Sequence, residues 1–267
     1  MKKLILFTLF SLCIALQASA WNPMIMTSGS SAAAIDYSDI TLWVNFLNGP
    51  TSGSANYTIL EGTTEHSAGD TTLLLSAGAV VSTTAKKDSN YGLYGVGAYD
   101  YGSLVPNAGD IISDDEGRFG TWLRIQTWVV NALILTTQTD ASNQIRLTIV
   151  GGSDSDIEFK SDYIYGGTSV TKTSTTFNGV ENTWYFVETA WKQGAAGSGY
   201  LDVLVDGVSI ISDTTGTLGD MTGTINLLRV GENSDTASNL YFARILVSSD
   251  STRDLDALSD IINYPGN

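Results

Sequence analysis

Short stretches in which apolar and polar side chains alternate recur along most of this chain. The clearest are residues 144–150 (QIRLTIV), 183–192 (TWYFVETAWK) and 200–205 (YLDVLV). An alternation with period two places successive side chains on opposite faces, which predicts strands rather than helices. Segments rich in Gly, Asn, Asp and Ser separate these stretches, and Asp206-Gly207 is a strong signal for a tight hairpin.

The same pattern, followed along the chain, predicts about a dozen strands and one helix, with residues 57–60 as a possible short strand and 169–177 as a polar strand or edge. The predicted strands are residues 40–47, 57–60, 71–75, 79–84, 119–130, 131–137, 144–150, 157–165, 169–177, 183–192, 200–205, 208–211, 224–230 and 239–247. Residues 48–70 are expected to be mostly loop, and residues 105–117 an acidic loop. Residues 253–263 (RDLDALSDIIN) carry apolar residues at helical spacing. We therefore expect an all-β fold, a two-sheet antiparallel jelly-roll sandwich with one short C-terminal helix.

The first twenty residues form a separate pattern, which predicts a secretory signal peptide. Lys2 and Lys3 precede an apolar run from Leu4 to Leu16, and Ala18-Ser19-Ala20 is a small-residue cleavage pattern. The run is too short to be a typical membrane anchor. We expect cleavage after Ala20 and a secreted or periplasmic protein with no membrane insertion after cleavage. An uncleaved anchor is the alternative.

Residues 21–267 are expected to form one domain without a disulfide, because the one cysteine of the chain, Cys13, lies in the predicted signal. Without Lys2 and Lys3 the formal net charge changes from −15 to −17, with 11 basic against 28 acidic residues. This charge disfavours a nucleic-acid or anionic-lipid partner. It suits a neutral glycan or a cation, although solubility alone also accounts for it.

Six segments, in order, resemble the concanavalin A-like, laminin-G-like (LamG) jelly-roll superfamily. They are GVGAYDYGSLVP (95–106), FGTWLRI (119–125), NTWYFVETAWK (182–192), YLDVLVDGV (200–208), INLLRVGENSDTASNLYFARILVSS (225–249) and LDALSDIINY (255–264). The resemblance implies the sandwich fold, a glycan-binding or catalytic role, and in many members a calcium ion at the rim. A glycine that usual members carry before the last strand is not evident in Leu240-Tyr241-Phe242-Ala243. Within this frame the tyrosine-rich stretch 91–102 is interpreted as a signature of the fold.

Catalytic motifs of this superfamily are not found in the sequence. The Glu-x-Asp-x-x-Glu spacing of its β-glucanases places paired carboxylates on one strand face, and no segment carries it. Its lyases use a histidine, and the only histidine here is His66, in a polar segment. Because carboxylates from distant strands can also form a pair, a polysaccharide hydrolase or lyase remains the alternative to a non-enzymatic role.

Calcium ligands are the expected metal chemistry, because acidic residues cluster in two predicted loops. The candidate ligands are Asp110, Asp114, Asp115, Glu116 and Asp235. Carboxylate and carbonyl oxygens from loops are what Ca2+ takes as ligands. A solvated acidic loop is the alternative. Zinc is not expected from a chain with one histidine.

Aromatic residues near polar ones are the expected glycan ligands, since sugars stack on rings and hydrogen-bond to polar neighbours. The candidates are Tyr163, Tyr165, Trp191 and Tyr200. The alternative for each is packing in the core. We expect an exported, non-catalytic recognition domain that binds carbohydrate or an extracellular surface, with a structural calcium as an option. A structural component of the envelope or of an extracellular assembly is a further alternative.

Overall fold

The computed structural model describes residues 39–45, 58–61, 64–66, 71–76, 78–82, 85, 87, 92–95, 101–106, 112–113, 115–127, 132–151, 157–175, 177–221, 223–231 and 239–259. All of them belong to a compact unit that spans Tyr37–Asn267. The predicted signal peptide, residues 1–20, lies outside the described residues, as do Asp110, Asp114 and Asp235.

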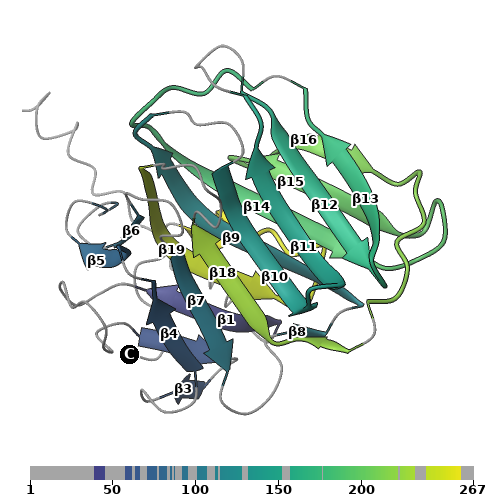
Figure 1. Ribbon diagram of the computed structural model, residues 1–267, viewed down its shortest axis with the longest axis horizontal. Helices are drawn as coiled ribbons and strands as arrows, with labels where there is room; N and C mark the ends of the chain where they lie inside the picture. The colour runs from purple at the N-terminus through teal and green to yellow at the C-terminus, as the bar shows by residue number, and fades with distance from the viewer. Residues whose placement is uncertain are drawn as a thin grey trace, which may run out of the picture. The chain divides into compact units, whose positions relative to one another are not determined.

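Two antiparallel sheets face each other and form a sandwich (Figure 1), which confirms the predicted all-β, two-sheet fold. The ten-stranded sheet contains β1 (Ile40–Asn45), β2 (Thr58–Glu61), β3 (Thr64–His66), β5 (Val80–Ser82), β6 (Gly92–Gly95), β9 (Glu116–Ile125), β14 (Trp184–Lys192), β15 (Tyr200–Val205), β16 (Val208–Asp213) and β19 (Leu240–Ser248). Its main path runs in the order β16-β15-β14-β9-β19-β1-β2-β3, and β6 pairs with β19 and β5.

The seven-stranded sheet runs in the order β13-β12-β11-β10-β18-β7-β4. Its strands are β4 (Thr71–Leu75), β7 (Tyr101–Pro106), β10 (Ala132–Asp140), β11 (Asn143–Ile149), β12 (Phe159–Tyr165), β13 (Thr168–Thr173) and β18 (Leu227–Gly231). A short pair, β8 (Ile112–Ser113) and β17 (Thr224–Ile225), stands apart from both sheets.

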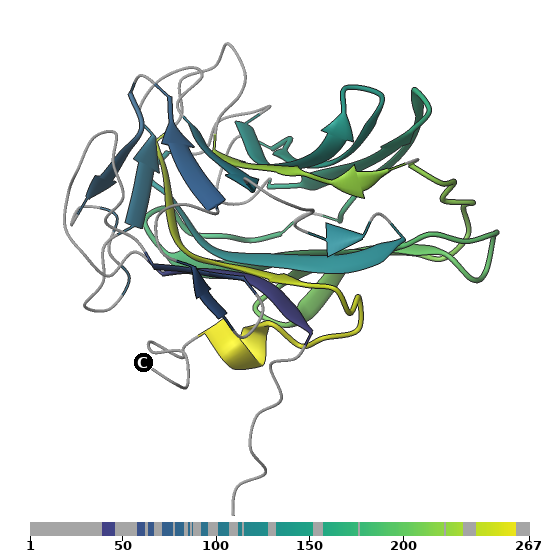
Figure 2. The ribbon, with the colours of Figure 1, turned by 90° about the horizontal axis from the view of Figure 1, so that it is seen from below.

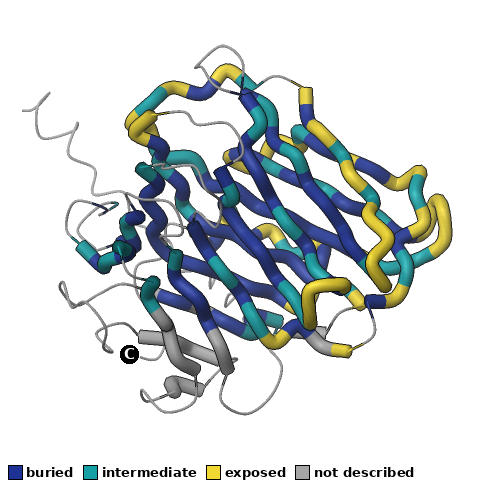
Figure 3. The backbone as a smooth tube through the Cα atoms, in the orientation of Figure 1, coloured by how far each residue is buried: buried dark blue, intermediate teal, exposed yellow. Residues whose placement is uncertain are grey.

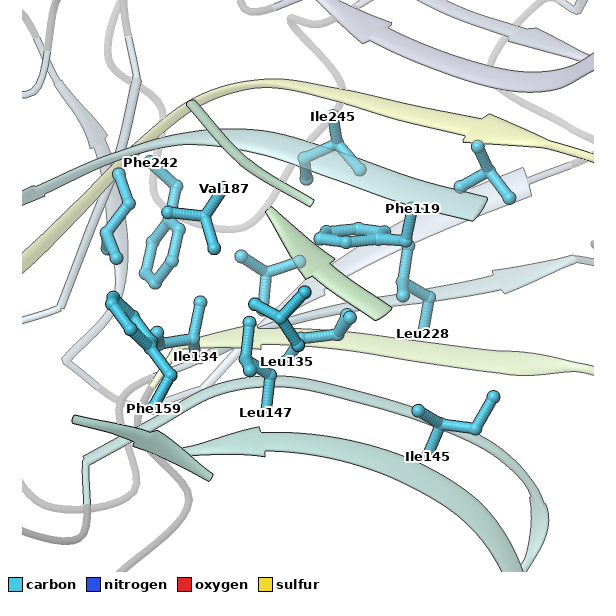
Figure 4. Packing of buried hydrophobic residues seen from close by; sticks show 14 of the residues in the cluster. Phe119, Ile134, Leu135, Ile145, Leu147, Phe159, Val187, Leu228, Phe242 and Ile245 are labelled. Atoms are coloured by element: carbon cyan, nitrogen blue, oxygen red, sulfur yellow. The ribbon is translucent and has the colours of Figure 1, made fainter. Parts of the chain in front are cut away.

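The core lies between the two sheets, where the apolar positions of the alternating strands meet. Figure 4 shows residues from both sheets facing one another, and these residues are nearly inaccessible to solvent. The ten-stranded sheet contributes Phe119, Val187, Phe242 and Ile245, and the seven-stranded sheet contributes Ile134, Leu135, Ile145, Leu147, Phe159 and Leu228. Burial alternates from residue to residue along β15 and along the first half of β11, as the sequence pattern predicts, whereas β19 and most of β14 are buried on both faces (Figure 3).

A second, smaller cluster lies on the outer face of the ten-stranded sheet. It is formed by Ile40, Phe186, Leu246, Leu255 and Leu258, with Trp122 packed against them. The helix α2 (Asp256–Ser259) carries part of this cluster and lies on the far side of the ten-stranded sheet from the seven-stranded one (Figure 2). The C-terminal helix is confirmed, and it begins at Asp256 rather than at residue 253.

Several predicted boundaries differ from the structure. The acidic segment 105–117 is not one loop, because it contains β8 and the first residues of β9, so Glu116 lies in a strand. The predicted strand 224–230 is divided between β17 and β18. Part of the predicted loop 48–70 forms the hairpin of β2 and β3.

Two local conformations follow directly from glycine and its neighbours. Asp206 and Gly207 have φ angles of 48° and 71°, the left-handed conformations of the predicted hairpin turn. A Cβ atom on Gly92 would collide with the carbonyl oxygens of Ala85 and Phe242, so β6 can lie against β19 only with glycine there.

Candidate functional site

A continuous row of polar residues crosses the outer face of the seven-stranded sheet. Directly opposed residues in antiparallel strands share a face, so the row can be followed through the register from strand to strand. It is formed by Thr171, Asp162, Arg146, Thr136, Arg229 and Ser103, each paired with the next. We call these six residues the polar row. Their sequence neighbours, such as Leu135 and Leu147, point into the core, so the polar row faces outward.

Asp162 joins one end of the polar row into a network. Its Oδ1 accepts a hydrogen bond of 2.6 Å from the Thr171 hydroxyl, and its Oδ2 accepts one of 3.1 Å from Nη2 of Arg146. Lys160 Nζ lies 3.4 Å from the same Oδ2. The Asp162 side chain is 3% exposed, whereas those of Arg146 and Lys160 are 37% and 33% exposed. The negative charge is therefore buried, and the positive charges remain accessible.

The middle of the polar row holds polar atoms without hydrogen-bond partners. Nε of Arg146, Oγ1 of Thr136 and Nε of Arg229 are all buried and have no partner. These three residues lie side by side on β11, β10 and β18. An unsatisfied buried polar group costs about 1–3 kcal/mol, so these three atoms favour a partner that completes their hydrogen bonds.

Arg229 is held by an aromatic ring instead of a carboxylate. Its guanidinium carbon lies 5.2 Å from the centroid of the Tyr101 ring, a cation–π contact from the neighbouring strand β7. Among the described residues Arg229 has no ion-pair partner. The ring limits the orientations of the guanidinium group, and no carboxylate in the described ranges neutralises its charge.

The polar row lies on a face that none of the described elements covers. In Figure 1 it is turned towards the viewer, and no described strand or helix crosses in front of it. A polar surface with accessible cations on an open sheet can hold a ligand by hydrogen bonds and charge. A group of side chains in which donors outnumber acceptors favours a ligand that brings acceptors.

Two of the predicted glycan ligands lie at the edge of the core. Tyr163 is 0% exposed, and its hydroxyl donates a 2.8 Å hydrogen bond to the carbonyl of Gly219. Tyr165 is partly buried, and a Cβ atom on Gly219 would collide with its ring, so Gly219 covers part of that ring. Both rings pack on the inner side of β12 and not on the polar row.

The other two predicted glycan ligands lie on different faces of the ten-stranded sheet. Trp191 is 0% exposed and belongs to the core between the sheets. Tyr200 is half-buried on β15, and burial raises the pKa of its hydroxyl against the effect of a hydrogen bond with Ser251. The structure therefore does not bring the four predicted rings together on one open surface.

Of the predicted calcium ligands, Asp115 and Glu116 are described. Asp115 is exposed, whereas Oε2 of Glu116 accepts hydrogen bonds of 3.1 Å from Lys192 and 2.7 Å from Ser251. Ser251 also bonds to Tyr200, so a predicted metal ligand and a predicted glycan ligand share one polar cluster. Within the described ranges, no three His, Cys, Asp or Glu side chains are placed to hold a metal ion.

The outer face of the ten-stranded sheet carries its own row, which consists of Trp184, Arg124, Tyr241 and Tyr94 on four adjacent strands. Arg124 lies 4.2 Å from the Tyr241 ring and 5.1 Å from the Trp184 ring. The Tyr94 and Tyr241 rings stack with centroids 4.5 Å apart. Burial raises the pKa of Tyr241 to about 12. We call these four residues the aromatic row.

A buried ion pair lies on this face, close to the smaller apolar cluster. Nε of Arg118 is 2.8 Å from Oε1 of Glu188, whose side chain is 0% exposed. Burial raises the pKa of Glu188, against the hydrogen bond and charge of Arg118, and the charges of Asp256 and Asp254 add to the increase.

The polar row was not predicted, although each strand carries its signal. Residues 144–150 alternate Gln144, Arg146 and Thr148 with three apolar residues, so the polar face of β11 is evident in the sequence. What the sequence does not give is the register that aligns Arg146 with Thr136 and Arg229.

Comparisons with known proteins identify the fold and leave the family open. No family model matches the chain, and no curated protein matches it. Solved structures that resemble it include the receptor-binding domain of botulinum neurotoxin type G, with a TM-score of 0.55 and 9% identity over 81% of this chain. The binding domain of botulinum neurotoxin serotype D/C VPI 5993 has a TM-score of 0.58 and 11% identity over 85% of this chain.

The chain spans about half the length of these structures, 49% and 53% respectively. At this level of identity the likeness shows a shared β-sandwich of jelly-roll type and nothing about the ligand. Among the described residues, no helix is long and apolar enough to cross a membrane.

Proposed function

We propose that this protein is an exported, non-catalytic recognition domain that binds carbohydrate on an extracellular surface through the outer face of its seven-stranded sheet. The observation that carries the proposal is the polar row, with three adjacent residues that hold unsatisfied polar atoms on an open face. Sugars offer many hydroxyl groups, which both donate and accept, so they can complete such a row.

Three further facts support the proposal without deciding it. The neighbouring solved structures are receptor-binding domains, which are binding modules by their printed names. The motif order resembles the concanavalin A-like, laminin-G-like superfamily, in which open sheet faces hold glycans. The N-terminal pattern of residues 1–20 predicts export, which is where such a partner would be met.

Both oxygens of Asp162 already have partners, namely Thr171, Arg146 and Lys160. Asp162 would therefore hold these side chains in place and would not bind the ligand itself. Calcium at Asp110, Asp114, Asp115, Glu116 or Asp235 remains a secondary proposal. Of these residues, Glu116 lies on the ten-stranded sheet and already has Lys192 and Ser251 as partners. Binding at the outer face of the seven-stranded sheet, here called the recognition face, therefore does not require the ion.

A glycan array with the full mature chain tests the proposal, run with and without calcium. Gln138 lies two residues beyond Thr136 on the same face, so Gln138→Trp should obstruct that face. Val208, exposed on the β15–β16 hairpin, gives the matched control Val208→Trp. We expect the wild-type protein and the Val208 variant to bind the same glycans, and the Gln138 variant to lose at least ten-fold in affinity.

Three results would overturn the proposal. Equal binding by the Gln138 and Val208 variants would place the ligand elsewhere, and binding to no glycan at all would favour a structural component. Release of reducing ends or unsaturated products from a polysaccharide would show a hydrolase or lyase instead.

A further inference from the structure

We infer that the centre of the polar row binds an anionic group, a carboxylate or a sulfate, of an acidic polysaccharide. The inference rests on the proposed function, because it names the class of glycan that the same face would take. It depends on the arrangement of Arg146, Thr136 and Arg229.

The two arginines flank the threonine on neighbouring strands. Thr136 pairs with Arg146 on one side and with Arg229 on the other. Strands in a sheet lie about 4.8 Å apart, so the two arginine Cα atoms are about 10 Å apart. Guanidinium groups at this separation, on long side chains, can converge on one anionic group or hold two successive ones. Their planar arrays of donors match carboxylate and sulfate oxygens.

The unsatisfied atoms specify the chemistry of the ligand. Arginine donates only, whereas the Thr136 hydroxyl can donate or accept, so donors outnumber acceptors among the side chains at the centre of the row. Thr136 is 3% exposed, so water does not reach its hydroxyl in the free protein. A carboxylate or sulfate accepts without donating, and it therefore complements this group better than a sugar hydroxyl does. To bind the anionic group, the guanidinium groups of Arg146 and Arg229 must turn towards it.

The charges at the row also favour an anion. Arg146 and Lys160 share the buried carboxylate of Asp162, and within the part of the chain that the structure describes Arg229 contacts the Tyr101 ring and no carboxylate. The face is thus locally positive on a chain with a formal net charge of −15. Because the rest of the protein repels polyanions, binding of a polyanion requires a local site and should weaken as salt increases.

The test uses two pairs of polysaccharides that differ in charge on the same backbone. Polygalacturonate is compared with its methyl ester, and dextran sulfate with dextran, by isothermal titration calorimetry on the mature chain. The two pairs distinguish a carboxylate from a sulfate. We expect at least one charged polymer to bind ten-fold or more tightly than its neutral partner, with affinity that falls as salt rises.

Arg229→Gln is the decisive variant, because no carboxylate among the described residues pairs with Arg229 and would lose its partner in the variant. Loss of a charge-assisted pair in Arg229→Gln should weaken binding by about 10- to 100-fold. Arg229→Lys keeps the charge but loses the planar guanidinium group, so its affinity should lie between those of the wild type and Arg229→Gln. Arg124→Gln is the matched control, since Arg124 also lies over an aromatic ring but on the other sheet. Circular dichroism spectra of the variants, compared with that of the wild-type protein, check that each variant is folded.

The results distinguish a failure of this inference from a failure of the proposed function. If charged and neutral polymers bind equally and Arg229→Gln changes nothing, while Gln138→Trp abolishes binding, the anion site is wrong and the recognition face stands. If Gln138→Trp also leaves binding unchanged, the recognition face is wrong as well.

Discussion

The two sheets turn very different outer faces towards their surroundings. On the ten-stranded sheet, Phe186 and Leu246 are covered by Leu255 and Leu258, and the nearby cation Arg118 has a carboxylate at 2.8 Å. On the seven-stranded sheet no described element covers the polar row, and Arg229 has no carboxylate partner among the described residues.

The difference shows how one sandwich separates stability from recognition. Both faces carry arginines beside aromatic rings, so composition alone does not distinguish them. A face whose apolar side chains are covered by other apolar side chains adds a second layer of core. A face that is open and whose donors are unsatisfied contributes little to folding and is available to a ligand.

The largest effect is expected for the small apolar cluster of the covered face. Phe186→Ala should lower the free energy of unfolding by about 3–5 kcal/mol, because Phe186 is fully buried and its neighbours cannot close the cavity. For a domain of this size each kcal/mol lowers Tm by about 2–4 °C. Calorimetry measures the loss, and affinity for the glycan per folded molecule should not change. A loss below about 1 kcal/mol would show that this cluster is not a second core.

A smaller effect is expected when the buried ion pair is broken. Arg118→Met should lower the free energy of unfolding by about 3 kcal/mol, because it leaves the Glu188 carboxylate buried without its partner. The double variant Arg118→Met with Glu188→Leu should recover most of that loss in urea unfolding. If the double variant is as unstable as the single one, the cost comes from lost packing and not from the uncompensated charge.

The dependence of stability on pH should be smaller still. Burial raises the pKa of Glu188 in the folded state, so between the ordinary glutamate value and the raised one the folded protein binds the proton more readily than the unfolded chain. The contribution of Glu188 to stability is therefore complete below that window and is lost as pH rises through it. The free energy of unfolding of the wild-type protein, minus that of the Glu188→Gln variant, should increase as pH falls. An increase as pH rises would mean that Arg118 lowers the pKa of Glu188.

The sequence predicted the fold because several strands, such as β11 and β15, carry their own alternation of apolar and polar residues. Strand β14 shows both the success and its limit. Its two faces were separated correctly, with Tyr185, Val187 and Trp191 on one and Trp184 and Phe186 on the other. Both faces are apolar, however, because a second cluster covers the outer one, and the sequence could not tell which face is inner. Trp191 was therefore a reasonable glycan candidate and is instead in the core.

The candidate site could not be predicted because its residues come together only through register. Arg146, Thr136 and Arg229 lie on strands that are neighbours in the sheet, and Arg229 is distant from the other two in the sequence. No local motif marks them. The apolar rings of Tyr163 and Tyr165 are prominent in the sequence, but period two places them on the core side of β12.

The most direct test compares the matched variants Arg229→Gln and Arg124→Gln by two measurements on the same samples, Tm and the Kd for the charged polysaccharide. Arg124 lies between two rings, and cation–π contacts of this kind contribute about 1 kcal/mol each, so its loss should lower Tm and leave Kd unchanged. Arg229→Gln should raise Kd by about 10- to 100-fold and change Tm little. An unchanged Kd for Arg229→Gln, or a larger loss of affinity for Arg124→Gln, would contradict the assignment of recognition to the seven-stranded sheet.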